Sequence, residues 1–161
     1  MEIDDKKFDR LKESVKKQYD SLDSVHCPYF KDKVHFKSFG YQHMFHKGPN
    51  NITRRLKKDQ YIRMKLFKYA PILLRDSKTV QEYQKKQDFI PVTHNNRTEK
   101  VLKDVEYWGF LGIVDDKRIK VVVKKIGRGQ LQYWSILPKW KSRRKGGKQD
   151  FVNYIKDLES I

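Results

Sequence analysis

Residues 107–137 read YWGFLGIVDDKRIKVVVKKIGRGQLQYWSIL, and this stretch decides the fold. Three runs rich in Val, Ile and aromatic residues are separated by Asp115-Asp116 and by Gly127-Arg128-Gly129, which favour turns. Runs of β-branched and aromatic residues between turn formers are typical of antiparallel strands. The stretch therefore predicts a three-stranded antiparallel meander.

The chain before the meander is predicted to be mainly helical. Phe8, Leu11, Val15 and Tyr19 recur at helical spacing, which predicts an amphipathic helix over about 4–20. Further expected elements are a short strand at 34–36, a helix over 39–47, a helix over 53–74 kinked at Pro71, a short helix over 79–87, a polar loop over 89–97 and a strand from about 101.

This order predicts an α+β fold in which N-terminal helices pack on a C-terminal antiparallel sheet of about four strands. The 161 residues are expected to form a single domain without repeats. Its parts are an N-terminal helix (1–24), a helical layer (34–90), the meander (101–138), and a basic extension with a short terminal helix (139–161).

The charge of the chain indicates the class of partner. The formal net charge is +17, and residues 107–148 hold twelve Lys/Arg against two Asp/Glu. Such an excess favours a polyanionic partner, most often nucleic acid and less often an anionic membrane surface.

The single cysteine, Cys27, excludes an internal disulfide and a cysteine-based zinc site. No apolar run approaches the roughly 20 residues of a membrane-spanning helix, and the first residues do not resemble a signal peptide. We therefore expect a cytoplasmic protein without a membrane partner or a cofactor.

Two histidines, His43 and His46, lie three residues apart on a predicted helix. Histidine titrates near neutral pH, so either could exchange a proton with a ribose hydroxyl or a leaving oxygen during RNA cleavage. The alternatives are a helix cap or a half-buried structural histidine. A zinc site is disfavoured, because carboxylates or cysteines to complete it are lacking nearby.

Strand alternation places Lys120 and Lys124 on one face of the central strand of the meander. Two lysines there could stabilise the charge of a phosphate in a transition state. The alternative is an open sheet face in contact with water. On the next strand, alternation places Tyr133 and Ser135 together, where either could bind or orient a phosphate, or simply pack in the fold.

Other cations are candidates for contact with nucleic acid. Residues 139–148 carry six cations and no acid, with an aromatic residue among them, a composition that suits phosphate contact with base stacking. A solubilising tail is the alternative. The predicted nucleic-acid-binding residues are Arg54, Arg55, Arg128, Lys139, Trp140, Lys141, Arg143 and Arg144.

The chain resembles the barnase–colicin–RelE (BECR) group of nucleases, in particular its phage and mobile-element branch. The resemblance lies in VHFKSFGYQHMFHK (34–47), YWGFLGIV (107–114), RIKVVVKKIG (118–127) and LQYWSILP (131–138). The chain is also similar to small basic bacterial proteins that share an RMKLFKYAPILL-like helix and YWGF…WSILP strands, a similarity that implies no activity.

The nuclease resemblance implies a metal-independent endoribonuclease, such as a toxin of a toxin–antitoxin or phage system with an acidic antitoxin as partner. It implies His43, with His46 as competitor, as acid or base. It implies Lys120 or Lys124 as the cation that stabilises the phosphate, and Ser135 or Tyr133 as the residue that orients it. Non-catalytic RNA or DNA binding, or binding of an acidic protein, are the alternatives.

Overall fold

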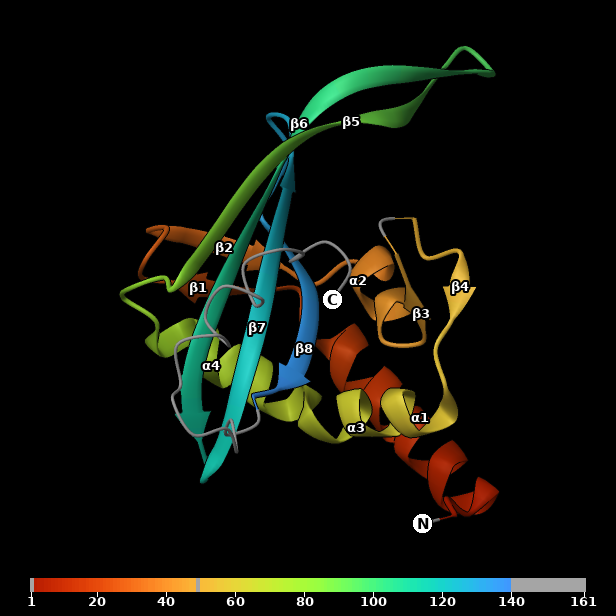
Figure 1. Cartoon of the computed structure of the whole chain (residues 1–161), viewed down its shortest axis with the longest axis vertical. Coiled ribbons are helices and arrows are strands. Elements are labelled where there is room, and N and C mark those ends of the chain that lie inside the picture. Colours follow the sequence, from red (N-terminus) through yellow and green to blue (C-terminus); the bar gives the residue numbers. More distant parts are fainter. Residues whose placement is uncertain (1, 49, 140–161) are drawn as a thin grey trace, which may run out of the picture.

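The computed structural model of the chain describes residues 2–48 and 50–139 and confirms the α+β class. Its main sheet has six strands in the order β1-β2-β8-β7-β6-β5, which is more than the four predicted (Figure 1). The sheet is mixed, since β2 and β8 are parallel while the other neighbours are antiparallel. Its strands are β1 (Ser24–Cys27), β2 (Asp32–His35), β5 (Glu82–His94), β6 (Arg97–Val114), β7 (Lys117–Ile126) and β8 (Gln132–Pro138).

The predicted meander is confirmed as β6, β7 and β8. The turn between β6 and β7 is Asp115-Asp116, and both residues have positive φ angles, of 49° and 58°. Two successive positive φ angles define a type I′ turn, whose twist matches that of the strands it joins. Asn95-Asn96, with φ angles of 48° and 62°, makes the corresponding turn between β5 and β6.

The helix predicted over 79–87 and the loop predicted over 89–97 are wrong. Residues 82–94 form β5, which pairs with β6 without interruption from Glu82–Gly109 to His94–Arg97. The residues of β5 alternate in exposure, as expected of a strand. The predicted helix rests on Thr79 and Glu82 at the positions of a capping box, a local signal that is weaker than the hydrogen bonds of a 13-residue strand.

The amphipathic helix predicted over 4–20 is confirmed as α1 (Asp5–Ser21). The Asp4 carboxylate accepts a hydrogen bond from the backbone N–H of Lys6 and caps its N-terminus. Phe8, Val15 and Tyr19 are the buried residues of this helix.

The helix predicted over 53–74 is divided into several elements. The chain forms β4 (Thr53–Arg54), α3 (Lys57–Leu66), a short 3₁₀ helix (Phe67–Tyr69) and α4 (Ala70–Asp76). Pro71 lies in the first turn of α4, where its missing N–H is tolerated, so the predicted interruption is confirmed. The helix predicted over 39–47 is shorter than expected: α2 spans Ser38–His43, and β3 (His46–Lys47) then pairs with β4.

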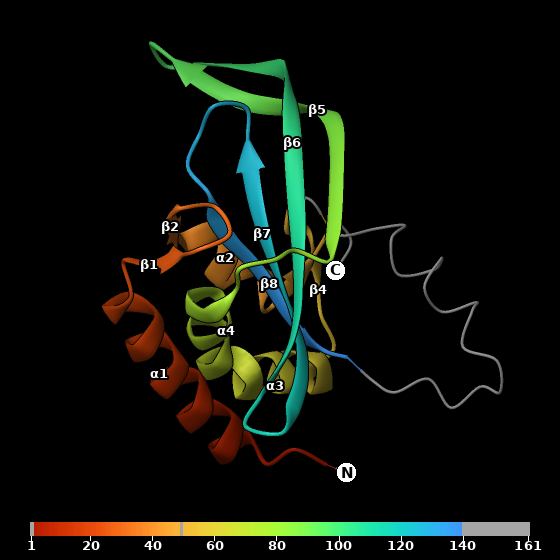
Figure 2. The same ribbon diagram turned by 90° about the vertical axis from the view of Figure 1, so that its left-hand side faces the viewer.

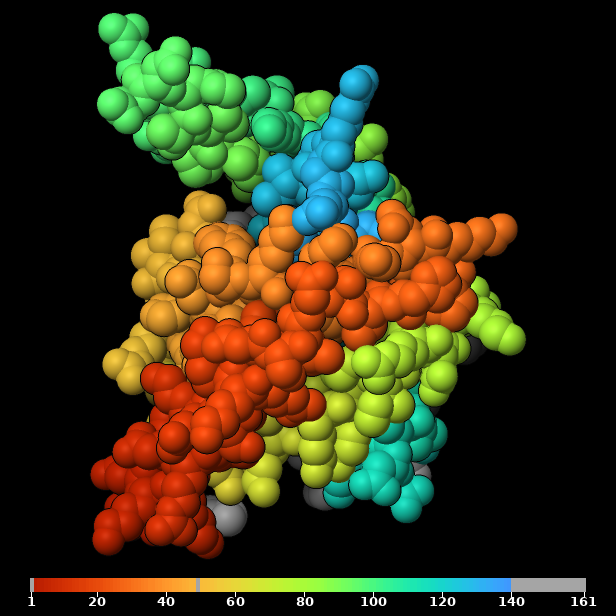
Figure 3. Space-filling view, turned by 180° about the vertical axis from the view of Figure 1, so that it is seen from behind, coloured from red at the N-terminus to blue at the C-terminus, as the bar shows by residue number. Residues whose placement is uncertain are grey.

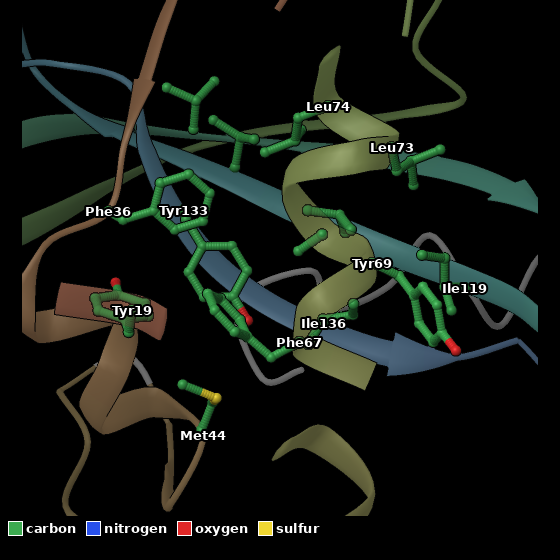
Figure 4. Close-up of a cluster of buried hydrophobic side chains, with 14 of the residues drawn as sticks. Tyr19, Phe36, Met44, Phe67, Tyr69, Leu73, Leu74, Ile119, Tyr133 and Ile136 are labelled. Atoms are coloured by element: carbon green, nitrogen blue, oxygen red, sulfur yellow. The ribbon is translucent and has the colours of Figure 1, made fainter. Parts of the chain in front are cut away.

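Helices α1, α3 and α4 cover one face of the sheet (Figures 2 and 3). The core between these helices and the sheet contains a cluster of aromatic rings (Figure 4). Tyr133 of β8 stacks on Phe36, with ring centroids 5.2 Å apart, and Tyr19 lies 5.2 Å from Phe67. Burying aromatic side chains of this size supplies much of the stability of a small domain.

The β8 edge is only partly covered by β2, because the two strands pair at a single position, His35–Gln132. Helices α2 and α3 contact the rest of β8. A second apolar cluster, formed by Val105, Tyr107, Val122 and Trp134, is separate from the main core. Val122 and Val123 are successive residues of β7 and point to opposite faces, so this cluster lies on the face of the sheet away from α1 and α4.

The far end of the β5–β6 hairpin projects beyond the rest of the fold (Figure 1). β6 pairs with β7 only from Val105 onward, so the strand partners of residues 87–104 are each other, and the Asp104 carbonyl oxygen additionally accepts a hydrogen bond from the Gly127 N–H. We call residues 87–104 the arm.

Within the described part of the chain, no helix is long and apolar enough to cross a membrane.

Candidate functional site

The candidate site is centred on Trp134, which owes its position to a β-bulge. Val122 pairs with Ser135 and Val123 pairs with Tyr133, so Trp134 is an extra residue on β8. A bulge of this kind changes the direction in which a side chain points. Trp134 joins the cluster of Tyr107 and Val122, where it is 1% exposed.

The bulge also corrects the predicted faces of β8. Strict alternation placed Tyr133 and Ser135 on one face, but the register places them on opposite faces, because their partners are successive residues of β7. Ser135 therefore shares a face with Lys120 and Lys124, while Tyr133 packs in the aromatic core. The prediction that Lys120 and Lys124 share a face is confirmed by their register.

His43 lies directly on Trp134. The two ring centroids are 3.8 Å apart with an interplanar angle of 20°. Phe39, one helical turn earlier on α2, stacks on Trp134 as well, at 5.4 Å. Residues four apart share a helix face, so the local geometry of α2 aims both rings at the bulge.

The hydrogen bonds of His43 define its protonation. Its Nε2 lies 3.1 Å from a guanidinium nitrogen of Arg55, which can only donate, so Nε2 accepts. Its Nδ1 lies 2.7 Å from Oδ1 of Asn51 and therefore carries the proton. Asn51 is oriented by donating from Nδ2 to the carbonyl oxygen of Phe39 at 3.1 Å. His43 is thus a neutral imidazole, and it is 0% exposed.

A network of charged residues continues from His43 toward β8. Asp59 accepts hydrogen bonds from Arg55 at 3.1 Å and from Arg63 at 2.9 Å. Arg63 also donates to the Ser135 hydroxyl at 2.6 Å. Both arginine side chains are buried, whereas that of Asp59 is 43% exposed. Burial by itself raises the pKa of Asp59, but the two guanidinium groups outweigh it and hold the pKa below its usual value.

Lys124 completes the cluster from β7. Its ammonium lies 4.0 Å from the centroid of the Trp134 ring, and 5.4 Å and 5.5 Å from those of Tyr107 and Phe39. This is the geometry of a cation–π interaction with three aromatic rings. Burial lowers the pKa of Lys124 to about 8, against a smaller opposing effect of the Asp88 carboxylate. The Lys124 ammonium is therefore expected to lose its proton only slightly above neutral pH.

Lys120 is held differently. It is 0% exposed, and its ammonium forms an ion pair with Glu82 of β5 at 2.9 Å. The alternative of a sheet face open to water is thus wrong for both lysines, since Lys124 is only 5% exposed.

Besides Lys120, two predicted catalytic residues lie outside the cluster. Tyr133 is buried on the opposite face of the sheet, where burial raises the pKa of its hydroxyl. His46 does not share a helix with His43, because α2 ends first, and its Nδ1 lies 3.2 Å from the carbonyl oxygen of Gln42. The cluster therefore brings together His43, Lys124 and, through Arg63, Ser135.

The predicted nucleic-acid-binding residues are placed as follows. Arg54 and Arg128 are exposed, and Lys139 is half-buried. The prediction that Arg55 binds nucleic acid needs an exposed side chain, but Arg55 is only 6% exposed and its guanidinium forms hydrogen bonds with His43 and Asp59 instead. Trp140, Lys141, Arg143 and Arg144 lie outside the described residues.

Sequence reasoning missed several residues of this network. Phe39, Asn51, Asp59, Arg63 and Trp134 are not close in the sequence, and a buried arginine looks like any other basic residue of an amphipathic helix. One signal was available: Asp59 is spaced four residues from both Arg55 and Arg63, the spacing at which side chains meet on a helix.

In residues 2–48 and 50–139 no group of three or more His, Cys, Asp or Glu side chains is arranged to hold a metal ion. Comparison of the chain with family models, with curated proteins and with solved structures found no match in any of the three.

Proposed function

We propose that the protein binds nucleic acid through contacts with phosphate groups, and that RNA is the favoured partner. The observation that carries this proposal is the formal net charge of +17 on 161 residues. A charge of this size attracts polyanions and accelerates their association. Arg54 and Arg128 are exposed and can contact phosphate groups, whereas Arg55, Lys120 and Lys124 are buried inside the fold.

Salt dependence tests this proposal. Fluorescence anisotropy with a labelled 20-nucleotide RNA should give an affinity that falls steeply between 50 and 200 mM KCl, because binding releases counterions. The matched control is labelled polyglutamate, a polyanion without bases or phosphates. Failure to bind RNA or DNA at 50 mM KCl would overturn the proposal, as would equal affinity for polyglutamate.

An endoribonuclease is the second candidate, favoured by the pKa of Lys124 and by the contact that Lys124 and His43 both make with Trp134. In this reaction a base removes the proton of a ribose 2′-OH, and the oxygen attacks the adjacent phosphate. A 2′,3′-cyclic phosphate forms as the 5′-oxygen leaves with a proton. Because His43 is 0% exposed, catalysis would require α2 or Trp134 to move and admit the phosphate.

The test of the nuclease is incubation with total RNA in EDTA, alongside His43→Ala and Lys124→Ala variants whose folding has been checked. Cleavage by the wild-type protein that is lost in both variants supports the assignment. Intact RNA with folded wild-type protein contradicts it. If the protein is a toxin, an acidic antitoxin should bind its cationic surface, and RNA should compete with that binding.

A further inference from the structure

A row of aromatic rings crosses the fold next to the base of the arm. Tyr29 contacts Phe30 with ring centroids 5.0 Å apart, Phe30 contacts Trp108 at 5.0 Å, and Trp108 contacts Tyr83 at 5.6 Å. We call these four residues the aromatic strip. Tyr29 is 38% exposed and Tyr83 is 48% exposed, so the strip reaches the surface at both ends. It is separate from the Trp134 cluster, since Trp108 and Phe30 belong to the main core.

Further exposed apolar residues lie on the arm. Residues 83, 85, 87 and 89 alternate with the half-buried residues of β5, so Tyr83 and Phe89 belong to the same side of that strand. Phe89 is 61% exposed and pairs with Leu102, which is 50% exposed. Large apolar side chains that are exposed together on a projecting hairpin indicate an interaction surface.

A groove of about 450 Å³ lies beside the strip, between β2, β6 and the turn that joins β7 to β8. The β7–β8 turn and the segment containing β2 meet on the side of the molecule shown in Figure 3. The apolar part of the groove is formed by Phe30, Trp108 and Leu131, and its cations are Lys33, Lys125 and Arg128.

The groove also has two carboxylates, Asp32 and Glu106. Glu106 accepts a hydrogen bond from the Tyr83 hydroxyl at 2.7 Å, which fixes the direction of that ring. The three cations leave the groove with a net positive charge even when both carboxylates are ionised. Aromatic rings beside cations are suited to binding a nucleotide, because the rings provide a stacking surface for the base and the cations neutralise the phosphate.

We propose that the aromatic strip and this groove bind single-stranded nucleic acid. A base stacks on Tyr83, another enters the groove against Trp108, and Lys125 and Arg128 contact the phosphates. Single strands are required because the faces of paired bases are covered by their neighbours in a duplex. This inference rests on the proposed function and adds to it the location of the interface and the class of ligand.

The test compares labelled single-stranded 12-mers of RNA and DNA with a 12-base-pair duplex by fluorescence anisotropy. Tyr83→Ala should weaken single-strand binding about tenfold, because it removes one stacking surface, while Tyr83→Phe should bind within about threefold of the wild type. Arg128→Ala should reduce the magnitude of the salt slope by about 0.7, the value for one phosphate contact with a single strand.

Matched controls are Lys17→Ala, which removes an exposed cation on α1, and Leu56→Ala, which removes an 82% exposed apolar side chain elsewhere. Both should bind as the wild type does. Tyr83 and Arg128 are exposed, so their variants should remain folded, and urea unfolding checks this. Crosslinking to 5-bromouridine RNA followed by mass spectrometry gives a second readout, which should identify Tyr83 or Trp108.

The outcomes separate the two proposals. Absence of any nucleic-acid binding by the wild type overturns the proposed function and this inference with it. Binding by the wild type that is unchanged in Tyr83→Ala and Arg128→Ala overturns only this inference, and is the result expected if the strip instead contacts a protein. Preference for the duplex over the single strands overturns it as well.

Discussion

His43 and Trp134 stack with their ring centroids 3.8 Å apart, and Lys124 lies 4.0 Å from the centroid of the same tryptophan ring. A helix, a bulged strand and the central strand of the sheet thus meet at one side chain. Trp134 is thus the shared contact of the Lys124 ammonium and of the His43 imidazole, whose Nε2 accepts a hydrogen bond from Arg55.

Trp134→Ala should destabilise the protein strongly. The substitution removes the stacking partner of His43 and Phe39 and the ring beneath Lys124, and leaves a cavity, at a cost of about 3–5 kcal/mol. Trp134→Phe should cost much less, because a ring remains and, among the described residues, the indole N–H has no hydrogen-bond acceptor to lose. Urea unfolding of both variants measures the difference; equal costs would contradict the role assigned to the ring.

Lys124 should make stability depend on pH. Its pKa is about 8 in the folded protein and 10.5 ordinarily, so between these values unfolding takes up a proton and stability rises with pH. Below pH 8 the ammonium is charged in both states, and its burial costs on the order of 3 kcal/mol.

Lys124→Met removes this effect while keeping an apolar side chain of similar length. The free energy of unfolding of the wild type relative to Lys124→Met should therefore rise by about 2 kcal/mol between pH 8 and pH 9.5. Tyrosines and other lysines are common to both proteins, so their titration cancels in the difference. An NMR titration of the lysine side chains should show one midpoint near pH 8. If the difference in unfolding free energy between the wild type and Lys124→Met does not change with pH, Lys124 does not have the low pKa assigned to it.

Asp59→Asn should destabilise the protein by about 2 kcal/mol, because it leaves Arg55 and Arg63 without their shared carboxylate. Breaking a fully buried pair costs more, about 3–5 kcal/mol, but Asp59 is 43% exposed. Because the arginines hold the pKa of Asp59 below 3.8, its contribution is present above that pH and is lost as the pH falls through the folded-state value.

Asp20→Asn is the matched control for Asp59→Asn. Asp20 forms a 2.9 Å ion pair with Lys16 on the exposed side of α1, and such solvent-screened surface pairs contribute little to stability. Chemical denaturation at pH 7 should therefore rank Asp59→Asn well above Asp20→Asn. The reverse order would show that the buried arginines do not depend on Asp59.

Gly40→Ala should displace α2 from the sheet. A Cβ at this position would lie 2.3 Å from the backbone carbonyl oxygen of Tyr133, which cannot move aside. Alanine is favoured over glycine in a helix by only about 1 kcal/mol, so the clash outweighs the gain and a net loss of more than 2 kcal/mol is expected.

Gly112→Ala is the corresponding control, since a Cβ there meets only the end of the flexible Leu73 side chain. It should cost less than about 1 kcal/mol, because that side chain can change rotamer. Thermal unfolding of both variants tests this order. Near-UV circular dichroism should also change in Gly40→Ala, because the rings of His43 and Phe39 would leave Trp134.

Much of this protein is determined by the sequence itself. The meander follows from β-branched runs and turn residues, α1 from the spacing of its apolar residues, and the break before α4 from Pro71. These features depend on interactions within a few residues. The shared face of Lys120 and Lys124 is likewise a consequence of strand periodicity.

The tertiary structure decided the rest. Residues 82–87 form a strand because each of them pairs with a residue of β6. This pairing cannot be seen in the local sequence pattern, which favours a helix. Because of the bulge at Trp134, Ser135 lies on the same face as Lys120 and Lys124. The alternation of apolar and polar residues in the sequence does not indicate that β8 contains an extra residue. Arg55, Arg63 and Lys124 are buried because they contact residues that are distant in the sequence. The sequence alone therefore suggests that these charged side chains are exposed, whereas the structure places them in the interior.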